Sequence, residues 1–122
     1  MSKNYLSRND ELRRGDYLMS NNGQWKAIFQ DDGNFVIYGW QPVWASDTNG
    51  SDAVRLIMQE DCNLVLYNND NRPKWASDTF TTGSHVCRLH LSDDGVLHLY
   101  KGAKELWNST KSKGGKRGET EN

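Results

Sequence analysis

Short runs of alternating apolar and polar residues, separated by turns rich in Gly, Asn and Asp, cover the chain from Tyr17 to Thr110. Around the first such turn, a wholly apolar set takes every second position: Ala27, Phe29, Phe35 and Ile37. A period of two is that of a half-buried strand, and no segment sustains the 3.6-residue period of a helix. The pattern therefore predicts an all-β fold of short strands.

The same strand-turn-strand pattern occurs three times, in repeats that span approximately 17–48, 53–79 and 84–110. A tryptophan closes each repeat, and these three, Trp44, Trp75 and Trp107, lie 31 and 32 residues apart. A fixed period of this length indicates a fold built from equivalent units. We expect one domain over residues 1–110, with the three indoles packed at its centre, followed by a solvated, flexible tail over 111–122.

One hairpin register fits all three repeats. If residues 31–33 form a three-residue loop with Gly33 in the left-handed conformation, Gln30 lies across from Asn34. The second repeat accepts this register with Cys62 in place of the turn glycine. Each hairpin then has one apolar face, which predicts three sheets packed around a common axis.

The outward face of the first two hairpins carries a recurrent set of Gln, Asp, Asn, Val and Tyr. The first set is Gln30, Asp32, Asn34, Val36 and Tyr38, and the second is Gln59, Asp61, Asn63, Val65 and Tyr67. Opposed side chains on paired strands have Cβ atoms about 5 Å apart, so each set forms a patch roughly one sugar wide. Amide, carboxylate and hydroxyl groups match the donors and acceptors of vicinal hydroxyls. The chemistry predicts a monosaccharide site that is used twice.

The third hairpin departs from this set. It keeps Asp94 and Tyr100, but has Ser92, Val96 and His98 where the others have Gln, Asn and Val. Two amides are lost, and with them several hydrogen bonds to a sugar. We expect this third position to be inactive.

Composition excludes several classes of function. A net charge of −1 argues against nucleic acid or a membrane surface as the partner, because both select strongly basic faces. No apolar run approaches the length of a membrane span, and residues 1–10 show no leader. The paired aspartates lie in hairpin turns beside no candidate pocket, so we expect no enzyme, no cofactor and no bound metal.

The two cysteines give information about redox environment. Cys62 lies in the second hairpin and Cys87 just before the third, so a bridge would join neighbouring repeats. Closing a loop of about 25 residues stabilises a fold by roughly 3.5 kcal/mol. We predict a structural disulfide and an oxidising location; the alternative is two buried free thiols in a cytosolic protein.

The motif Gln-x-Asp-x-Asn-x-Val-x-Tyr, present at 30–38 and 59–67, resembles the mannose-binding motif of the bulb-type (monocot mannose-binding, lily-type) lectins. The whole chain is most similar to the lily-type lectins of fish skin and gill mucus. The resemblance implies a β-prism II fold of three four-stranded antiparallel sheets with pseudo-threefold symmetry. It also implies calcium-independent binding of mannose and mannose-containing glycans, and a homodimer that exchanges C-terminal strands.

The resemblance further implies a role for each site residue. In the family pattern the Asp and Asn positions hold the axial 2-hydroxyl, Gln the 3-hydroxyl and Tyr the 4-hydroxyl, while Val lies against the ring. Carried over, these are Asp32 and Asn34, Gln30, Tyr38 and Val36 in the first site, and Asp61 and Asn63, Gln59, Tyr67 and Val65 in the second. The implied biology is recognition of microbial or cell-surface glycans in mucosal innate defence, with secretion to mucus favoured over cytoplasmic storage.

Three other signals compete with this interpretation. Arg14-Gly15-Asp16 is an integrin-type tripeptide, which makes a protein-binding adhesion module with unused sugar sites the alternative function. The register places His90 across from His98, a pair that lacks the further ligands a transition metal needs. Trp25 and Trp40 have no counterparts in the other repeats, and the sequence leaves open whether they flank a site or an interface.

Overall fold

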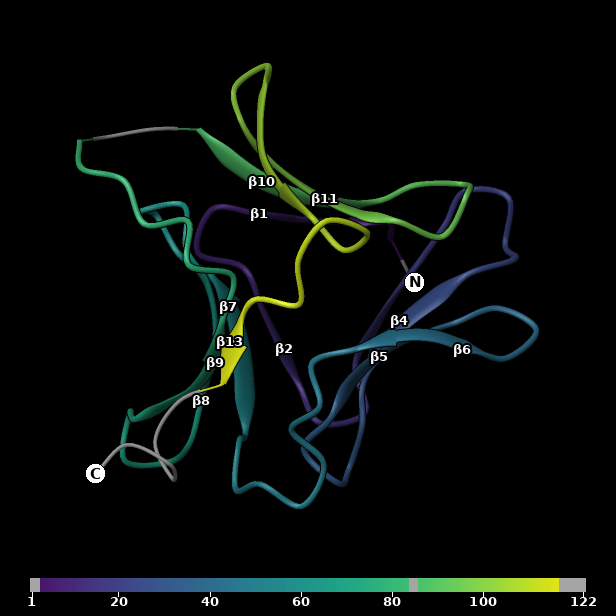
Figure 1. Ribbon diagram of the computed structural model, residues 1–122, viewed down its shortest axis with the longest axis horizontal. Helices are drawn as coiled ribbons and strands as arrows, with labels where there is room; N and C mark the ends of the chain where they lie inside the picture. The colour runs from purple at the N-terminus through teal and green to yellow at the C-terminus, as the bar shows by residue number, and fades with distance from the viewer. Residues whose placement is uncertain (1–2, 84–85, 117–122) are drawn as a thin grey trace.

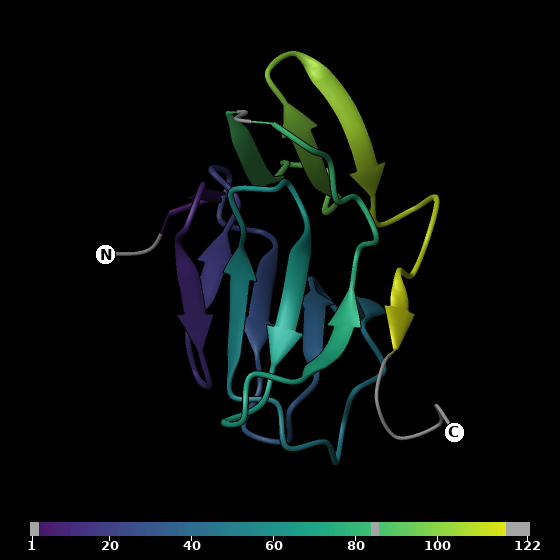
Figure 2. The same cartoon turned by 90° about the vertical axis from the view of Figure 1, so that its left-hand side faces the viewer.

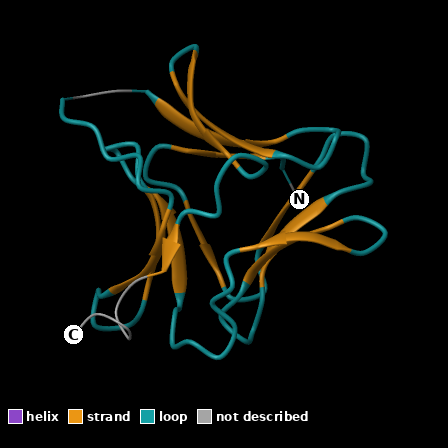
Figure 3. Cartoon of the chain, in the orientation of Figure 1, coloured by secondary structure: helices purple, strands orange, loops and turns teal. Residues whose placement is uncertain are grey.

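Three antiparallel sheets form the sides of a triangular prism (Figure 1). The computed structural model describes residues 3–83 and 86–116, and this part of the chain contains thirteen strands and no helix (Figure 3). No helix in the described ranges could therefore cross a membrane. The first residues of the chain and of the third repeat, and the end of the expected tail, lie outside the described residues. The architecture confirms the predicted all-β class and the common axis.

Each sheet takes its central strands from one repeat. The first sheet has the order β3 (Tyr17–Met19), β4 (Lys26–Phe29), β5 (Phe35–Tyr38), β6 (Pro42–Ala45). The second sheet has the order β13 (Gly115–Lys116), β9 (Pro73–Ala76), β8 (Leu64–Tyr67), β7 (Arg55–Met58), β2 (Glu11–Arg13). The third sheet has the order β1 (Tyr5–Ser7), β10 (Cys87–Leu91), β11 (Leu97–Lys101), β12 (Lys104–Asn108).

The N-terminal segment supplies one outer strand to every sheet. The strands β1, β2 and β3 follow one another along the chain and pair with β10, β7 and β4. Each buries a single leucine in the core, at positions 6, 12 and 18. The sequence predicted strands only from Tyr17 onward and missed β1 and β2, because a three-residue strand with one apolar side chain shows no alternation to detect.

The predicted hairpin register is correct in all three repeats. Ile28 pairs with Val36 in the first hairpin, Ile57 with Val65 in the second, and His90 with His98 in the third. The third turn residue has a left-handed backbone each time, with φ of +88° at Gly33, +71° at Cys62 and +83° at Gly95. Each sheet also shows a register shift beside the tyrosine of its polar set, between β5 and β6, β8 and β9, and β11 and β12.

The apolar faces meet at the prism axis. Trp44, Trp75 and Trp107 lie edge to face around it, with ring centroids 5.8, 5.8 and 6.0 Å apart. Nearly all the inward residues predicted from alternation are fully buried, including Phe29, Phe35 and the leucines of the second and third hairpins. The three indoles are therefore core residues, as predicted, and the outward faces remain available for other chemistry.

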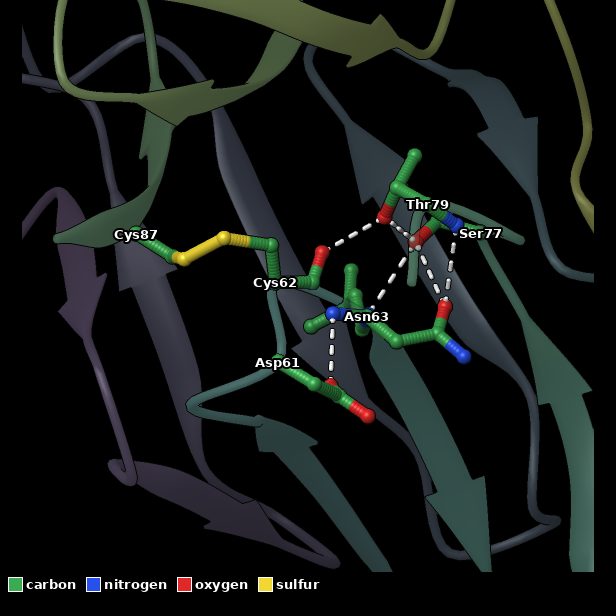
Figure 4. Close-up of a disulfide and its surroundings, with 7 residues drawn as sticks. Asp61, Cys62, Asn63, Ser77, Thr79 and Cys87 are labelled. Atoms are coloured by element: carbon green, nitrogen blue, oxygen red, sulfur yellow. Dashed lines mark hydrogen bonds between the residues drawn. A yellow bond between two sulfur atoms is a disulfide. The ribbon is translucent and has the colours of Figure 1, made fainter. Parts of the chain in front are cut away.

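Each hairpin turn is held by a different part of the chain. The first turn is bound by Arg14, whose guanidinium donates to the carbonyl oxygens of Asp31 at 2.5 Å, Ser51 at 3.0 Å and Ala53 at 2.8 Å. The second turn is joined to β10 by the predicted Cys62–Cys87 disulfide, whose Cα atoms lie 5.3 Å apart (Figure 4).

The loop between β3 and β4 holds the third turn. The Asn22 backbone N–H donates to the Asp93 carboxylate at 2.9 Å, and the Asn22 amide donates to the Asp93 carbonyl at 3.0 Å. Trp25 packs against both Gly39 and Gly95, where an added Cβ atom would lie 2.4 and 2.6 Å from its ring. Trp25 therefore joins the first sheet to the third hairpin, whereas Trp40 is 98% exposed.

The C-terminal segment differs from the flexible tail expected over 111–122. Its first residues continue the fold: β13 pairs with β9 at the edge of the second sheet (Figure 2), which gives that sheet five strands instead of four. The Trp75 indole N–H donates to the Lys113 carbonyl at 2.6 Å, and the Lys113 ammonium donates to the Ala45 carbonyl at 3.0 Å. Composition alone misled the prediction, because backbone contacts hold this polar segment. Residues 117–122 lie outside the described residues.

Candidate functional site

The first polar set lies on the outward face of the β4–β5 hairpin. The Gln30 amide donates to the Tyr38 hydroxyl at 3.2 Å, and the Asn34 backbone N–H donates to Asp32 Oδ1 at 3.0 Å. Because this N–H binds Oδ1, it does not occupy the other carboxylate oxygen of Asp32, Oδ2. Val36 is only 3% exposed, so it forms the floor of the patch. All five predicted residues are thus brought together on one surface.

The segments that directly follow β6 and β9 fix the orientation of the asparagine amides in the two polar sets. Asn34 Oδ1 accepts from the Ser46 hydroxyl at 3.2 Å and from the Thr48 backbone N–H at 3.1 Å. Since a backbone N–H can only donate, the amide oxygen must face Thr48, and the NH₂ group is left for a ligand. The Thr48 hydroxyl in turn donates to the Gly33 carbonyl at 2.6 Å.

The second hairpin repeats this arrangement, and Figure 4 shows the part of it around Asn63. The Gln59 amide donates to the Tyr67 hydroxyl at 2.5 Å, and the Asn63 N–H donates to Asp61 Oδ1 at 3.0 Å. Asn63 Oδ1 accepts from the Ser77 hydroxyl at 3.3 Å and from the Thr79 N–H at 3.2 Å. Val65 is 2% exposed.

Four residues that position the amides were missed at the level of sequence: Ser46, Thr48, Ser77 and Thr79. Their signal was present, because the run Trp-Ala-Ser-Asp-Thr follows both polar sets at the same offset. It was interpreted only as a mark of the repeat, since the contacts that give it a function join residues 12 to 17 positions apart.

The third hairpin fills the equivalent surface with its own side chains. The Val–Ala pair that floors the other two patches is replaced here by His98 across from Asn108. His98 Nδ1 contacts the Glu105 carboxylate at 2.5 Å, and the Asn108 amide donates to the same carboxylate at 2.9 Å. The hydrogen bond from His98 lowers the pKa of Glu105. The Ser92 hydroxyl contacts the Asp94 carboxylate and also lies within hydrogen-bond distance of the Val96 carbonyl and the Val96 N–H.

His90 lies across from His98, as the register predicted. Their rings are stacked with centroids 6.5 Å apart, and His98 is also stacked on Tyr100 at 5.9 Å. Burial, and then the nearby charge of His98, lowers the pKa of His90. Within residues 3–83 and 86–116, no three His, Cys, Asp or Glu side chains come together as metal ligands.

The Arg14-Gly15-Asp16 tripeptide has a structural role. The three carbonyl bonds of Arg14 occupy its guanidinium, and the Asp16 carboxylate accepts from the Arg13 backbone N–H at 2.8 Å. Gly15 has φ of +94°, which favours glycine there. An integrin-type partner would need both side chains free, so the structure gives no support to adhesion through this tripeptide.

Comparison with known proteins extends these observations. No family model matches the chain. The B-type lectin plumieribetin, from the fish Scorpaena plumieri, is 61% identical over 113 residues, which cover 93% of this chain and 100% of that protein.

Solved structures share the fold. Monomeric monocot mannose-binding lectins from Gastrodia elata match with a TM-score of 0.80 and 34% identity, over 89% of this chain and 98% of that one. The mannose-specific agglutinin of snowdrop (Galanthus nivalis), complexed with methyl-α-D-mannoside, matches with a TM-score of 0.73 and 36% identity, over 80% of this chain and 89% of that one.

Three sheets around a tryptophan core, with a polar set repeated on the outward faces of the first two central hairpins, define a lectin domain of the β-prism II type. The chain belongs to the bulb-type (B-type) lectin family. The family resemblance carried by the two motifs is thereby confirmed. Its relatives are lectins, which bind glycans and are not an enzyme family.

Proposed function

We propose that the protein binds mannose at two sites per chain, formed by the polar sets of the first and second hairpins. The observation that carries this proposal is the identical fixing of Asn34 and Asn63, whose amide oxygens are both held by the Ser and Thr that follow the last strand of the repeat. A family relationship to lectins with mannose in their names supports the choice of sugar.

Each residue type has a distinct role in this proposal. The Asp and Asn side chains hold the axial 2-hydroxyl, which distinguishes mannose from glucose, and Gln and Tyr hold the 3- and 4-hydroxyls. The valine contacts ring carbons. Four or five hydrogen bonds at about 1 kcal/mol each give an affinity near 1 mM per site. Useful avidity at a surface then requires several sites at once.

Binding in this proposal needs no calcium. Each set offers one carboxylate, while Ca²⁺ takes six to eight oxygen ligands. Titration calorimetry with methyl α-D-mannoside should therefore show two sites per chain, with the same affinity in excess EDTA. The matched control is methyl α-D-glucoside, which has an equatorial 2-hydroxyl and should bind at least about tenfold more weakly, a difference of ~1.4 kcal/mol. Loss of binding in EDTA, restored by calcium, would contradict the proposal.

We further propose secretion, a role in mucosal defence, and a homodimer that exchanges C-terminal strands. The Cys62–Cys87 disulfide supports an oxidising location. Within one chain, β12 and β13 already complete the third and second sheets, so exchange would move strands that have equivalent positions in a partner. Light scattering should then give twice the chain mass of 14.0 kDa. A measured mass of one chain would refute the proposed dimer without contradicting the proposed sugar sites.

A further inference from the structure

A cleft lies directly beside the first polar set, along the outward side of β4 and next to β3. It has a volume of about 530 Å³, and Gln30 and Tyr38 of the polar set form part of its wall. The rest of its wall comes from neighbours on β3, β4 and the loops beside them: Met19, Gly23, Gln24, Trp25, Lys26, Ile28 and Gly39. The cleft is therefore continuous with the proposed mannose site and large enough for a further sugar ring.

The wall of this cleft has the chemistry of a sugar subsite. Trp25 supplies an aromatic surface whose position is set by its packing against Gly39 and Gly95. Met19 and Ile28 add apolar surface that suits the C–H face of a pyranose. The side chains of Lys26 and Gln24 supply hydrogen-bond donors at the rim.

The outer strands make the first and second sites different. Tyr17 and Met19 of β3 pair with β4 in the same register in which Glu11 and Arg13 of β2 pair with β7. Tyr17 therefore corresponds to Glu11, and Met19 to Arg13. In the first sheet, the Lys26 ammonium lies 4.3 Å from the centroid of the Tyr17 ring, and this ring is 38% exposed.

The equivalent region of the second sheet is occupied by paired charges. Arg55 lies 3.5 Å from Glu11 and donates to the Asn71 side chain at 2.7 Å, and Arg13 also contacts Glu11. Val54 stands before Arg55 where Trp25 stands before Lys26. A second sugar here would have to displace an ion pair and would find no indole to contact.

We propose that the first site is an extended site, which binds a mannose together with the adjacent sugar of an oligomannoside, while the second site binds a single mannose. This inference rests on the proposed mannose function. It makes one chain a lectin with two unequal sites, in which the outer strand from the N-terminal segment sets the length of glycan recognised.

The test uses two single-site proteins, Asn63→Ala and Asn34→Ala, which keep only the first or the second site. Each is titrated with methyl α-D-mannoside and with the methyl glycosides of α1,2-, α1,3- and α1,6-mannobiose. With the first site alone, at least one mannobioside should bind about tenfold tighter than the monosaccharide. With the second site alone, the mannobioside ratio, which is the affinity for a mannobioside divided by that for methyl α-D-mannoside, should stay within about twofold for every linkage. Equal ratios in the two proteins would overturn the inference.

A swap of outer-strand residues assigns the effect to the cleft. Met19→Arg introduces the residue of the second sheet and should reduce the mannobioside ratio of the first site to about two or less. The matched control, Arg13→Met, should leave that ratio unchanged. Gln24→Ala, in an exposed loop, should reduce the ratio by about threefold and serves if Met19→Arg does not fold. A ratio that survives both cleft variants refutes the subsite. If methyl α-D-mannoside binds to neither single-site protein, the proposed function itself fails.

Discussion

The first two hairpins and the third share a backbone but not an outer surface. In all three, the serine directly after the last strand accepts from the strand before it: Ser46 from Phe35 N–H, Ser77 from Leu64 N–H and Ser109 from Leu97 N–H, at 3.1, 3.1 and 3.0 Å. The asparagine amide, however, has become Val96, and Lys111 follows where Thr48 and Thr79 stand.

This difference separates folding from binding in one molecule. The inward half of each hairpin must fill the prism, so its leucines and its tryptophan are retained in the third repeat. The outward half contributes little to the core and has changed to a His98–Glu105–Asn108 cluster. Substitutions on the outward face should therefore alter sugar binding without unfolding the protein.

The largest effect is expected from removal of both amides. Asn34→Ala and Asn63→Ala should each abolish one site, at a cost of about 2–3 kcal/mol, because a hydrogen-bonding group is lost inside a shared network. The double variant should keep its circular dichroism spectrum and melting temperature to within a few degrees while losing measurable mannose binding. Full binding by the double variant would show that the third hairpin is a site.

A converse experiment converts the third hairpin. In the double variant, Ser92→Gln, Val96→Asn and His98→Val restore the polar set, and Asn108→Ala with Lys111→Thr restores its floor and its amide support. We expect the five changes to create one site of about millimolar affinity, detectable by NMR titration. The first three changes alone should bind more weakly, because Asn108 still occupies the floor. Equal binding by the two proteins would show that the surrounding contacts are unimportant.

A smaller effect is expected from the residues that position the amides. Thr48→Val should weaken the first site about tenfold, or ~1.4 kcal/mol, because it removes the hydroxyl bonded to the Gly33 carbonyl and to Ser46. The same substitution after β12, Thr110→Val, is the control and should leave calorimetric binding unchanged, because Thr110 lies outside both polar sets. A Thr48→Val protein with wild-type affinity would assign Thr48 to the fold alone.

The smallest effect concerns pH. The lowered pKa of His90 means that the unfolded chain takes up its proton first, so stability should decline as pH falls below the ordinary value of 6.5. The charges of His98 and Arg88 lower the pKa of His90 further and that of Asp93 raises it, and Tyr5 lies across from His90 on β1. The lowered pKa of Glu105 adds a second loss below 4.5, as the carboxylate that His98 and Asn108 contact is protonated.

Melting curves between pH 7.5 and 5.5 should thus show a small drop that His90→Gln abolishes. Mannose affinity should stay constant over this range, because all three histidines of the chain lie at positions 85, 90 and 98, outside the first two hairpins. A drop of equal size in the His90→Gln protein would assign the effect to other groups.

Much of the fold follows from local pattern. The hairpin registers depend on alternation and on the turn residue, which adjacent positions reveal, and both were predicted correctly. Outer strands β1 and β2 were missed because each is held in an extended conformation by a strand far along the chain, β10 and β7 respectively. The fate of residues 111–116 was missed for the same reason, since a polar segment is fixed here by the backbone of β9 and the indole of Trp75.

The site divides in the same way. The polar sets were visible because their members alternate along one hairpin. The supporting Ser and Thr contact residues of another strand. The cleft beside the first site depends on β3, and no local sequence motif predicts the register in which β3 pairs with β4. Trp25 was noted for having no counterparts, but its role emerges only from its contacts with Gly39 and Gly95.

The three unlike contacts that hold the hairpin turns bear on how the chain finds its native arrangement. Near-identical hairpins carry a risk of exchange during folding, because each could occupy the position of another with little change in core packing. Arg14 binds the Asp31 carbonyl of the first turn, Cys87 is bonded to Cys62 of the second, and the indole of Trp25 packs against Gly95 of the third. Each of these contacts is specific to one hairpin in an otherwise symmetric fold. A hairpin in the wrong position would lose its contact, so the native order of the hairpins is lower in energy than any exchanged order.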